Sequence, residues 1–439
     1  MMKASSSPLR TGPLRIGIAG LGTVGVGVIK ILEERKDILS AHTGQALEIT
    51  TVSARDRRRD RGVDLSGYDW CDNTVELAER DNVDMVIELI GGSDGPAYAL
   101  AKETLKRGKA FITANKALVA VHGRELAELA EANNAYLRFE AAVAGGIPII
   151  KALREGLIGN EISSIQGILN GTCNYILTRM ENEGLDFDVI LEEAQKIGYA
   201  EADPTFDIEG IDTAHKTAIL AALAYGYAPD ITNLPTEGIT KIGTVDIDYA
   251  RQLGYRIKLL GIARKSEKGI ETRVYPAMVP LDSAIAKVAG ATNAVVVEGS
   301  YVGQTVYEGA GAGEGPTASA VVADIMDVVR GNAGPVFGLP SHTLAQSDSV
   351  SENDYSGTFY VRLRVDDEPG VMAHITAVLA EEKVSIGSLL QLGSAVSGGV
   401  YIVMTTHVTS EDSILAALKH FTELECVLET PTMLRIEAC

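Results

Sequence analysis

The sequence predicts an α/β protein in which a doubly wound parallel sheet is followed by an α+β domain and a small C-terminal α+β domain. Three observations lead to this prediction. Strand-like and helical stretches alternate over residues 13–141, as in a parallel sheet with helices on both faces. The two kinds of stretch are mixed over residues 142–340. Residues 341–357, rich in Ser, Asp and Asn, read as a linker, and residues 358–439 then return to strand, helix and strand.

The elements follow from hydrophobic runs and their spacing. In the first domain we expect strands at residues 14–19, 47–52, 83–90, 110–113 and 136–139, with a helix over residues 23–35. In the second, residues 162–169 and 294–298 read as strands and residues 211–225 as a helix. In the third, a helix at 370–381 stands between strands at 358–365 and 399–406.

Length and composition agree with several folded domains. The 439 residues suggest about three domains. Hydrophobic residues make up 46% and charged residues 22%, which is typical of a soluble globular protein. The net charge of −20 repels phosphate backbones and anionic lipids, so neither nucleic acid nor a membrane is an expected partner.

Cysteine and histidine spacing argues against a disulfide framework or a zinc site. The four cysteines lie far apart with no C-x-x-C pair, and the seven histidines form no ligand-spaced cluster. The first residues contain no apolar leader, and no run of about 18 apolar residues occurs that could cross a bilayer. The expected compartment is the reducing cytoplasm.

A glycine motif, G-x-G-x-x-G, stands between the first strand and the first helix. Its first glycine permits a tight turn, the second lets a pyrophosphate approach the backbone, and the third allows close packing of helix on strand. An ordinary glycine-rich turn is the alternative, but the strand–turn–helix context favours a Rossmann-type dinucleotide site. Its cofactor-binding residues are predicted to be Gly20, Gly22, Thr23, Val24 and Gly25.

The end of the second strand carries arginines where an NAD-binding chain usually has a carboxylate. Arg55 and Arg57 are suited to pair with a ribose 2′-phosphate, so NADP is the expected cofactor. Asp56 lies close enough that use of NAD stays open. A solvated charge run is the alternative for the whole segment.

Five carboxylates and a lysine are concentrated in residues 201–216. Asp212 and Lys216 are four residues apart on the expected helix and so share one face. A partly desolvated lysine can donate or accept a proton, and nearby carboxylates can hold a substrate ammonium group. The alternative is a surface helix with an acidic first turn and an i,i+4 ion pair.

The same region carries the run A-x-x-x-G-Y-A-x-x-D-P-x-x-D-I-x-G-x-D-x-x-x-K, which resembles the signature of the homoserine dehydrogenase family at all of its positions. The resemblance extends in the same order through the glycine motif, I-E-L-I-G-G at 87–92, T-A-N-K at 113–116 and N-G-T-C-N-Y-I at 170–176. It covers residues 14–338.

The resemblance implies reversible, nicotinamide-dependent interconversion of L-aspartate 4-semialdehyde and L-homoserine, on the route to threonine and methionine. Lys216 takes the position of the proton donor to the aldehyde oxygen, Asp212 that of its carboxylate partner, and Lys116 that of a bridge between cofactor and substrate. A positioned ammonium would stabilise the charge that hydride transfer builds on the oxygen and then quench it. Expected substrate-binding residues are Glu201, Asp207, Tyr199 and Thr172, and Ser93 and Gly311 are expected to flank the cofactor.

Residues 140–148 resemble the cation loop of the same family. The resemblance implies a structural sodium ion held by Glu140 and by the main-chain carbonyls of Val143, Gly145 and Ile147, since hard oxygen ligands suit such an ion. A glycine-rich hinge without an ion is the alternative.

The segment D-D-E-P-G-V at 366–371 resembles the start of an ACT domain. Exposed amides at this strand-to-helix turn could capture an amino acid, and the family suggests L-threonine as an effector. A dimerisation module without a ligand is the alternative, and a homodimer or homotetramer is expected.

Other functions stay open at this point. One is an amino-acid sensor that has kept a nucleotide fold without turnover, although Lys116, Asp212 and Lys216 argue against it. Another is a related semialdehyde or amino-acid dehydrogenase. A nucleophilic Cys173 would imply an aldehyde-oxidising enzyme, but no histidine lies near it in the sequence, so inert packing is expected.

Overall fold

The chain folds into two compact units, each assembled from separate segments. The computed structural model describes residues 12–266, 268–345, 355–391 and 399–438. Unit 1 comprises Met1–Ile165, His215–Thr232 and Val297–Ser347, and unit 2 comprises Gln166–Ala214, Asn233–Val296 and Asp348–Cys439. Helix α9 (Ile211–Tyr225) contributes residues to both units.

Unit 1 is built on a parallel six-stranded sheet with the order β3-β2-β1-β4-β5-β6. The strands are β1 (Leu14–Ala19), β2 (Leu47–Ser53), β3 (Asp69–Trp70), β4 (Met85–Glu88), β5 (Ala110–Thr113) and β6 (Leu137–Arg138). The predicted doubly wound parallel sheet is therefore confirmed. The sequence analysis missed β3, because a strand of two residues has no hydrophobic period to detect.

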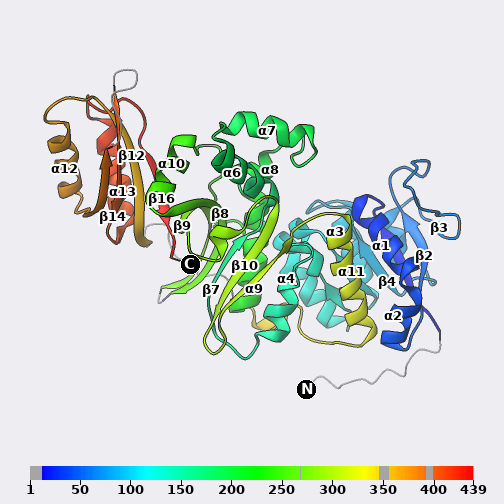
Figure 1. Ribbon diagram of the computed structural model, residues 1–439. Coiled ribbons are helices and arrows are strands. Elements are labelled where there is room, and N and C mark those ends of the chain that lie inside the picture. The colour runs from blue at the N-terminus through cyan, green and yellow to red at the C-terminus, as the bar shows by residue number, and fades with distance from the viewer. Residues whose placement is uncertain (1–11, 267, 346–354, 392–398, 439) are drawn as a thin grey trace. The chain divides into compact units, whose positions relative to one another are not determined.

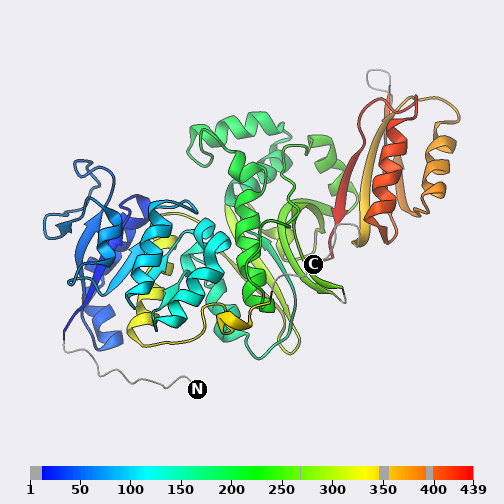
Figure 2. The same cartoon turned by 180° about the vertical axis from the view of Figure 1, so that it is seen from behind.

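Helices cover both faces of this sheet. Helices α1 (Thr23–Glu34) and α11 (Glu314–Val329) pack on one face (Figure 1), and α3 (Pro96–Lys106) and α4 (Lys116–Ala132) on the other (Figure 2). Ile16 and Ile18 of β1 share a buried core with Val28 of α1 and Val321 of α11. A Cβ on Gly27 would lie 2.8 Å from the Glu314 side chain, so this glycine allows α1 and α11 to approach closely.

The remaining elements of unit 1 are short apart from one strand. They are α2 (Lys36–Thr43), the 3₁₀ turns η1 (Thr74–Ala78), η2 (Glu140–Ala142) and η5 (Ser341–Thr343), α5 (Ile149–Lys151), the π turn η3 (Ala152–Gly156) and β11 (Gly303–Ala310). The turn η5 lies within the predicted linker, of which residues 346–354 fall outside the described residues.

Most strands of a second, mixed sheet lie in unit 2; the full order of this sheet is β11-β10-β7-β8-β9-β16-β12-β14-β13. Besides β11, its strands are β7 (Ile162–Ile168), β8 (Tyr255–Ser266), β9 (Gly269–Pro280), β10 (Thr292–Gly299), β12 (Ser356–Val365), β13 (Ile386–Gln391), β14 (Val400–Thr406) and β16 (Thr432–Ile436). β8 and β9 form a long antiparallel hairpin. The accompanying helices are α6 (Gly171–Glu183), α7 (Phe187–Lys196), α8 (Thr205–Ile208) and α10 (Thr244–Gln252), with the turn η4 (Ile285–Lys287).

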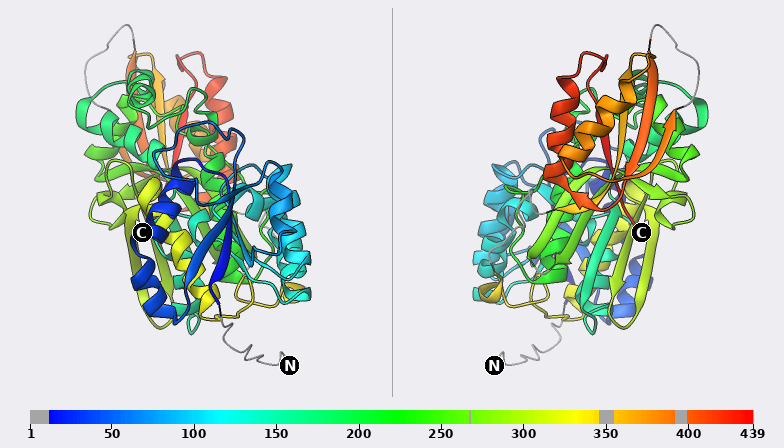
Figure 3. Two further views of the ribbon diagram at one scale, coloured as in Figure 1. Left: turned by 90° about the vertical axis from the view of Figure 1, so that its right-hand side faces the viewer. Right: turned by 90° about the vertical axis from the view of Figure 1, so that its left-hand side faces the viewer.

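The C-terminal part of unit 2 is a four-stranded sheet with two helices on one face. Helices α12 (Val371–Glu381) and α13 (Glu411–Thr422) lie against β16, β12, β14 and β13 (Figure 3), and the short β15 (Thr409–Ser410) pairs with β12. This is the strand-and-helix pattern predicted for the third domain. β16 pairs antiparallel with β12 and parallel with β9, so one sheet runs through both parts of unit 2.

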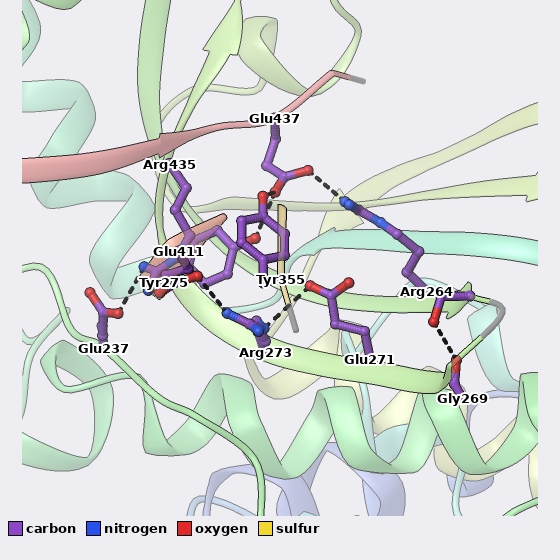
Figure 4. A network of polar contacts seen from close by, with 11 residues as sticks. Glu237, Arg264, Gly269, Glu271, Arg273, Tyr275, Tyr355, Glu411, Arg435 and Glu437 are labelled. Carbon is purple, nitrogen blue, oxygen red and sulfur yellow. Dashed lines mark hydrogen bonds and ion pairs between the residues drawn. The ribbon is translucent and has the colours of Figure 1, made fainter. Parts of the chain in front are cut away.

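A buried polar network surrounds β16 where it meets β9 (Figure 4). Glu411, at the start of α13, accepts hydrogen bonds from Arg273 of β9 and Arg435 of β16. Glu437 accepts hydrogen bonds from the hydroxyls of Tyr275 at 2.6 Å and Tyr355 at 3.0 Å. Each buried charge thus has a partner of opposite charge or a hydrogen-bond donor, which burial requires.

Candidate active site

The glycine turn after β1 has the geometry of a dinucleotide cradle. Gly20 has φ +101°, and a Cβ there would lie 2.5 Å from the Leu89 carbonyl oxygen. A Cβ on Gly25 would lie 2.1 Å from the Gly20 carbonyl oxygen. A Cβ on Gly22 would meet no atom of the described residues within 4 Å, so the approach to the N-terminus of α1 is open there. An anionic group is favoured at this position, because the first amides of α1, including those of Thr23 and Val24, have no partner within the helix.

The loop after β2 places Arg55 and Arg57 on the surface. The Arg57 guanidinium lies 5.8 Å from the Trp70 ring centroid. Arg61, which the sequence analysis did not single out, donates to the carbonyl of Leu21 at 3.1 Å and to that of Arg59 at 2.7 Å. Arg61 therefore ties the basic loop to the glycine turn, and no local sequence pattern indicates this contact.

A buried carboxylate joins the ends of β4 and β5. Glu88 is fully buried, and its Oε1 accepts from the amides of Ile90 at 2.6 Å and Gly91 at 3.0 Å. Its Oε2 accepts from the Thr113 hydroxyl at 2.5 Å, and the Thr113 oxygen in turn accepts from the Asn115 amide at 2.9 Å. Glu88 thus shapes the loop that also carries Ser93, whose hydroxyl donates to Asp94 at 2.8 Å.

Lys116 is the first residue of α4 and is half-buried. Asn115 caps this helix: its Oδ1 accepts from the Leu118 amide at 3.1 Å and its Nδ2 donates to the Gly92 carbonyl at 2.7 Å. A cation at a helix N-terminus is disfavoured by about 0.3–1 kcal/mol. A lysine at this place therefore costs stability, which favours a functional role for it.

Three predicted substrate or catalytic residues come together around Asn170 in unit 2. The Asn170 Nδ2 donates to Asp207 Oδ1 at 2.8 Å and to Asp212 Oδ2 at 2.9 Å. The Thr172 hydroxyl lies 2.9 Å from the Tyr199 carbonyl oxygen and 3.3 Å from Asp207 Oδ2. Because α6 begins at Gly171, Asn170 and Thr172 sit on either side of its first residue.

Helix α9 confirms the predicted spacing of Asp212 and Lys216. Both side chains are buried, with 3% and 8% of their surface exposed. Charged side chains are rarely this buried unless they are paired. The alternative of a solvated surface helix is therefore wrong for these two positions.

Glu201 follows two residues after Tyr199, whose main-chain carbonyl oxygen contacts the Thr172 hydroxyl. Glu201 and Tyr199 lie exposed on the segment between α7 and α8. The Glu201 carbonyl accepts from Gln195 at 3.0 Å, while the Tyr199 ring lies 4.8 Å from that of Tyr175.

Cys173 has a structural environment. Its side chain is buried, its sulfur lies 3.2 Å from the Asp207 carbonyl oxygen, and its amide donates to Asn170 Oδ1 at 2.8 Å. A thiol that solvent cannot reach is unreactive. These contacts support the expected inert packing.

The predicted cation loop follows η2. The Glu140 carboxylate accepts from the amides of Ile150 at 3.0 Å and Lys151 at 2.9 Å, and burial raises the pKa of this carboxyl from 4.5 to about 8. The Ile147 carbonyl accepts from the Ile149 amide at 2.8 Å. Hard oxygens are thus present as a sodium ion requires, and each has a second lone pair for it.

The loop containing Gly145 packs against Gly311, although the two were predicted to serve different ligands. Gly145 has φ +46°, and a Cβ there would lie 2.4 Å from the Gly311 carbonyl oxygen. Within the described residues, no group of three or more His, Cys, Asp or Glu could hold a metal ion. No helix in the described part of the chain is long and apolar enough to span a membrane.

Comparison with protein families gives three matches along the chain. Residues 20–140 match the model of the homoserine dehydrogenase NAD-binding domain, residues 148–326 that of homoserine dehydrogenase, and residues 359–426 that of the ACT domain. The first match and the glycine cradle show that the cofactor is a nicotinamide dinucleotide. The last identifies the C-terminal strands and helices as an ACT domain.

Curated relatives and solved structures agree with these matches. Homoserine dehydrogenase from Helicobacter pylori is 44% identical over 93% of this chain and 96% of its own, and that from Neisseria gonorrhoeae is 44% identical over 93% and 95%. The crystal structure of a homoserine dehydrogenase from Thiobacillus denitrificans has a TM-score of 0.92 and 43% identity over 97% of this chain and 98% of its own. A hyperthermophilic archaeal homoserine dehydrogenase in complex with NADPH has a TM-score of 0.61 and 29% identity over 72% and 97%. The chain belongs to the homoserine dehydrogenase family, and it is an oxidoreductase that acts on a CH–OH group.

Proposed function

We propose that this chain reduces L-aspartate 4-semialdehyde reversibly to L-homoserine with NADPH, in threonine and methionine biosynthesis. The observation that carries the proposal is the buried pair of Asp212 and Lys216, one helical turn apart on α9, with Asp212 held by Asn170. A nicotinamide, when bound, supplies the hydride to the aldehyde carbon or accepts it from the alcohol. The protein must then manage the proton on the oxygen.

Lys216 is proposed as the group that gives this proton in reduction and takes it back in oxidation. Its ammonium would stabilise the developing alkoxide, and Asp212 would keep the ammonium charged and oriented. Lys116, at the start of α4, would bridge cofactor and substrate. Asp207, Thr172, Tyr199 and Glu201 would bind the substrate, with Glu201 holding its amino group.

The proposed role of Glu201 in holding the substrate amino group depends on where this residue lies. Glu201 is exposed, so it would bind the substrate amino group from the segment between α7 and α8. Asp207 already lies in the cluster, and it is the second carboxylate suited to an ammonium group.

NADP is proposed over NAD because Arg55 and Arg57 are exposed after β2, on a loop that Arg61 holds against the glycine turn. Guanidinium groups bind a 2′-phosphate by charge-assisted hydrogen bonds. The glycine turn, Ser93 and Gly311 would contact the rest of the dinucleotide. A relative of known structure binds NADPH, which supports the same choice.

Four expectations stay predictions. They are a structural sodium ion at Glu140, Val143, Gly145 and Ile147, threonine binding to the ACT domain, assembly into a homodimer or homotetramer, and a cytoplasmic location. For threonine the test is direct. If millimolar L-threonine changes neither turnover nor melting temperature, the regulatory role is rejected.

The reaction is tested by following NADPH absorbance with L-aspartate 4-semialdehyde, with and without phosphate, and by identifying the product. We expect phosphate-independent oxidation of NADPH and formation of homoserine. Phosphate-dependent formation of NADPH would instead indicate an acyl-phosphate-forming semialdehyde dehydrogenase. Binding of NADPH without turnover would favour the amino-acid sensor.

A further inference from the structure

Asn170 is a buried amide that contacts three separate segments of unit 2. It has 5% of its surface exposed and is the N-cap of α6, where its Oδ1 accepts from the Cys173 amide at 2.8 Å. Its Nδ2 donates both to Asp207, in α8, and to Asp212, in α9. We propose that Asn170 is a positioning residue for the reaction, because it holds these two carboxylates in one fixed arrangement. The inference rests on the proposed function, in which Asp212 orients Lys216 and Asp207 binds substrate.

The chemistry of the amide fits this role better than that of any other short side chain. Asparagine offers an acceptor on one side and two N–H donors on the other. The oxygen must face the Cys173 amide, so the NH₂ group must face the two carboxylates. An aspartate of the same shape could accept from Cys173 but could not donate to Asp207 and Asp212, and it would add a third negative charge.

The backbone around Asn170 leaves the two carboxylates little freedom to rearrange. A Cβ on Gly171 would lie 2.7 Å from the Ala291 carbonyl oxygen, so the start of α6 packs tightly against that segment. Gly210, between the two aspartates, has φ +82°, and a Cβ there would lie 3.0 Å from the Val274 side chain. The turn that joins α8 to α9 is therefore fixed, and it directs both aspartates towards one amide.

Two carboxylates that share a donor repel each other once the donor is removed. Without the Asn170 NH₂ group, either the two side chains move apart or one of them takes up a proton. In the first case Asp212 no longer orients Lys216, and in the second it no longer stabilises the ammonium charge. A misplacement of about 1 Å in a catalytic site can cost about 100-fold in rate.

The decisive variant is Asn170→Asp, since it preserves shape and the helix cap but reverses the donor side. We expect kcat/KM for L-homoserine to fall at least about 100-fold. The acid limb of its pH profile should move to higher pH, because the carboxylates then ionise against an added charge. Asn170→Ser removes the shared donor without adding a charge: it should lower kcat/KM less than Asn170→Asp does and move the acid limb to higher pH by a smaller amount.

Asn73 provides a matched control. It caps η1 through Oδ1, which accepts from the Val75 amide at 3.2 Å, and its Nδ2 donates to the Glu76 carboxylate at 3.2 Å. Asn73→Asp therefore makes the same chemical change at an exposed cap, and kcat/KM should stay within about two-fold of that of the unmodified protein. Two outcomes would overturn the proposal. One is an equal loss of kcat/KM in Asn73→Asp and Asn170→Asp. The other is an Asn170→Asp variant whose kcat/KM and acid limb match those of the unmodified protein.

Crystal structures of the full chain carrying Asn170→Ser and Asn170→Asp give a readout that does not depend on turnover. We expect the carboxylates of Asp207 and Asp212 to lie farther apart than in the unmodified protein. Unchanged carboxylate positions in both variants would contradict the positioning role. If the unmodified protein does not oxidise homoserine, the proposed function fails while this structural test still decides what Asn170 holds. If Asn170→Asp does not fold, Asn170→Ser decides alone.

Discussion

Arg362 in β12 donates from Nε to Asp246 Oδ1 in α10 at 2.7 Å, and both side chains are buried. The Tyr360 hydroxyl donates to the same oxygen at 3.0 Å, and Asp246 Oδ2 accepts from the Gly243 amide at 3.2 Å. Asp246 thus caps α10 and binds the ACT domain at the same time. It is a fixed connection between the ACT domain and the β8–β9 part of unit 2.

Arg362→Met should destabilise the protein by about 3–5 kcal/mol, because it leaves the buried Asp246 charge without its cation. Urea unfolding measures this loss. The double variant Asp246→Asn/Arg362→Met should be more stable than Arg362→Met, since no charge is then left buried. A double variant less stable than the single one would show that the charge on Asp246 is not the cause.

Lys216→Ala should lower kcat by about two to four orders of magnitude, the range expected on loss of a general acid. The variant should stay folded and bind NADPH like the unmodified protein, but its melting temperature should fall because the buried Asp212 loses its cationic neighbour. Lys196→Ala removes an exposed lysine of α7 and should leave kcat unchanged. Full activity of Lys216→Ala in stopped-flow and steady-state assays would exclude the proposed proton transfer.

Glu201→Gln should mainly raise KM for L-homoserine, by about 10-fold, as expected for loss of a charge-assisted hydrogen bond of about 1.5 kcal/mol. Its effect on kcat should be smaller. Glu192→Gln, on the exposed face of α7, is the control and should leave KM unchanged. An unchanged KM in Glu201→Gln would place the ammonium site at another residue.

The double variant Arg55→Ala/Arg57→Ala should raise KM for NADPH by about 10-fold or more while KM for NADH stays the same, because only NADPH carries the 2′-phosphate. Arg58→Ala, an exposed arginine of the same loop, controls for general loss of positive charge. Steady-state assays with both cofactors measure the preference. A parallel rise for NADPH and NADH would mean that the two arginines do not recognise the phosphate.

Glu140 should make stability depend on pH. Burial raises its pKa in the folded protein from 4.5 to about 8, so the folded state binds more protons than the unfolded state between these values. The contribution of Glu140 to the free energy of unfolding is therefore fully present below about pH 4.5, and it is lost as the pH rises towards 8. Glu140→Gln does not titrate, so its free energy of unfolding should fall less from pH 5.5 to pH 8 than that of the unmodified protein.

Urea unfolding at the two pH values measures the difference for Glu140→Gln. The amide also alters the hydrogen bonds to Ile150 and Lys151, but that cost is the same at both pH values. The prediction would be contradicted if the difference in free energy of unfolding between Glu140→Gln and the unmodified protein were the same at both pH values. Sodium in place of a bulky organic cation should stabilise the unmodified protein at pH 8 if the loop binds the ion.

Hydrophobic period and the glycine motif were sufficient to predict the nucleotide-binding sheet. The runs that became β1 and β5 are mostly apolar and bounded by turns, so local sequence determines them. The strands β8 and β9 were not identified, because their apolar runs are mixed with arginine, lysine and glutamate. Two of those charges, Arg273 and Arg264, pair with Glu411 and Glu437, which lie more than a hundred residues away in the chain.

Prediction of the site from sequence is limited in the same way. The spacing of Asp212 and Lys216 follows from one helix and could be predicted from sequence. The contacts of Asn170, Glu88 and Arg61 join segments that only the tertiary fold brings together, and an amide or a single carboxylate leaves no periodic signal. The exposed placement of Glu201 likewise follows from the loop between α7 and α8, whose conformation the sequence pattern does not determine.

The position of β16 has a consequence for biosynthesis. β9 and β12 leave the ribosome before β16, yet each forms hydrogen bonds with β16 in the finished sheet. Until residues 432–436 emerge, the nascent chain presents two open sheet edges, which are templates for wrong pairing. Chaperone protection late in translation would therefore matter more for this protein than for one whose domains close in sequence order.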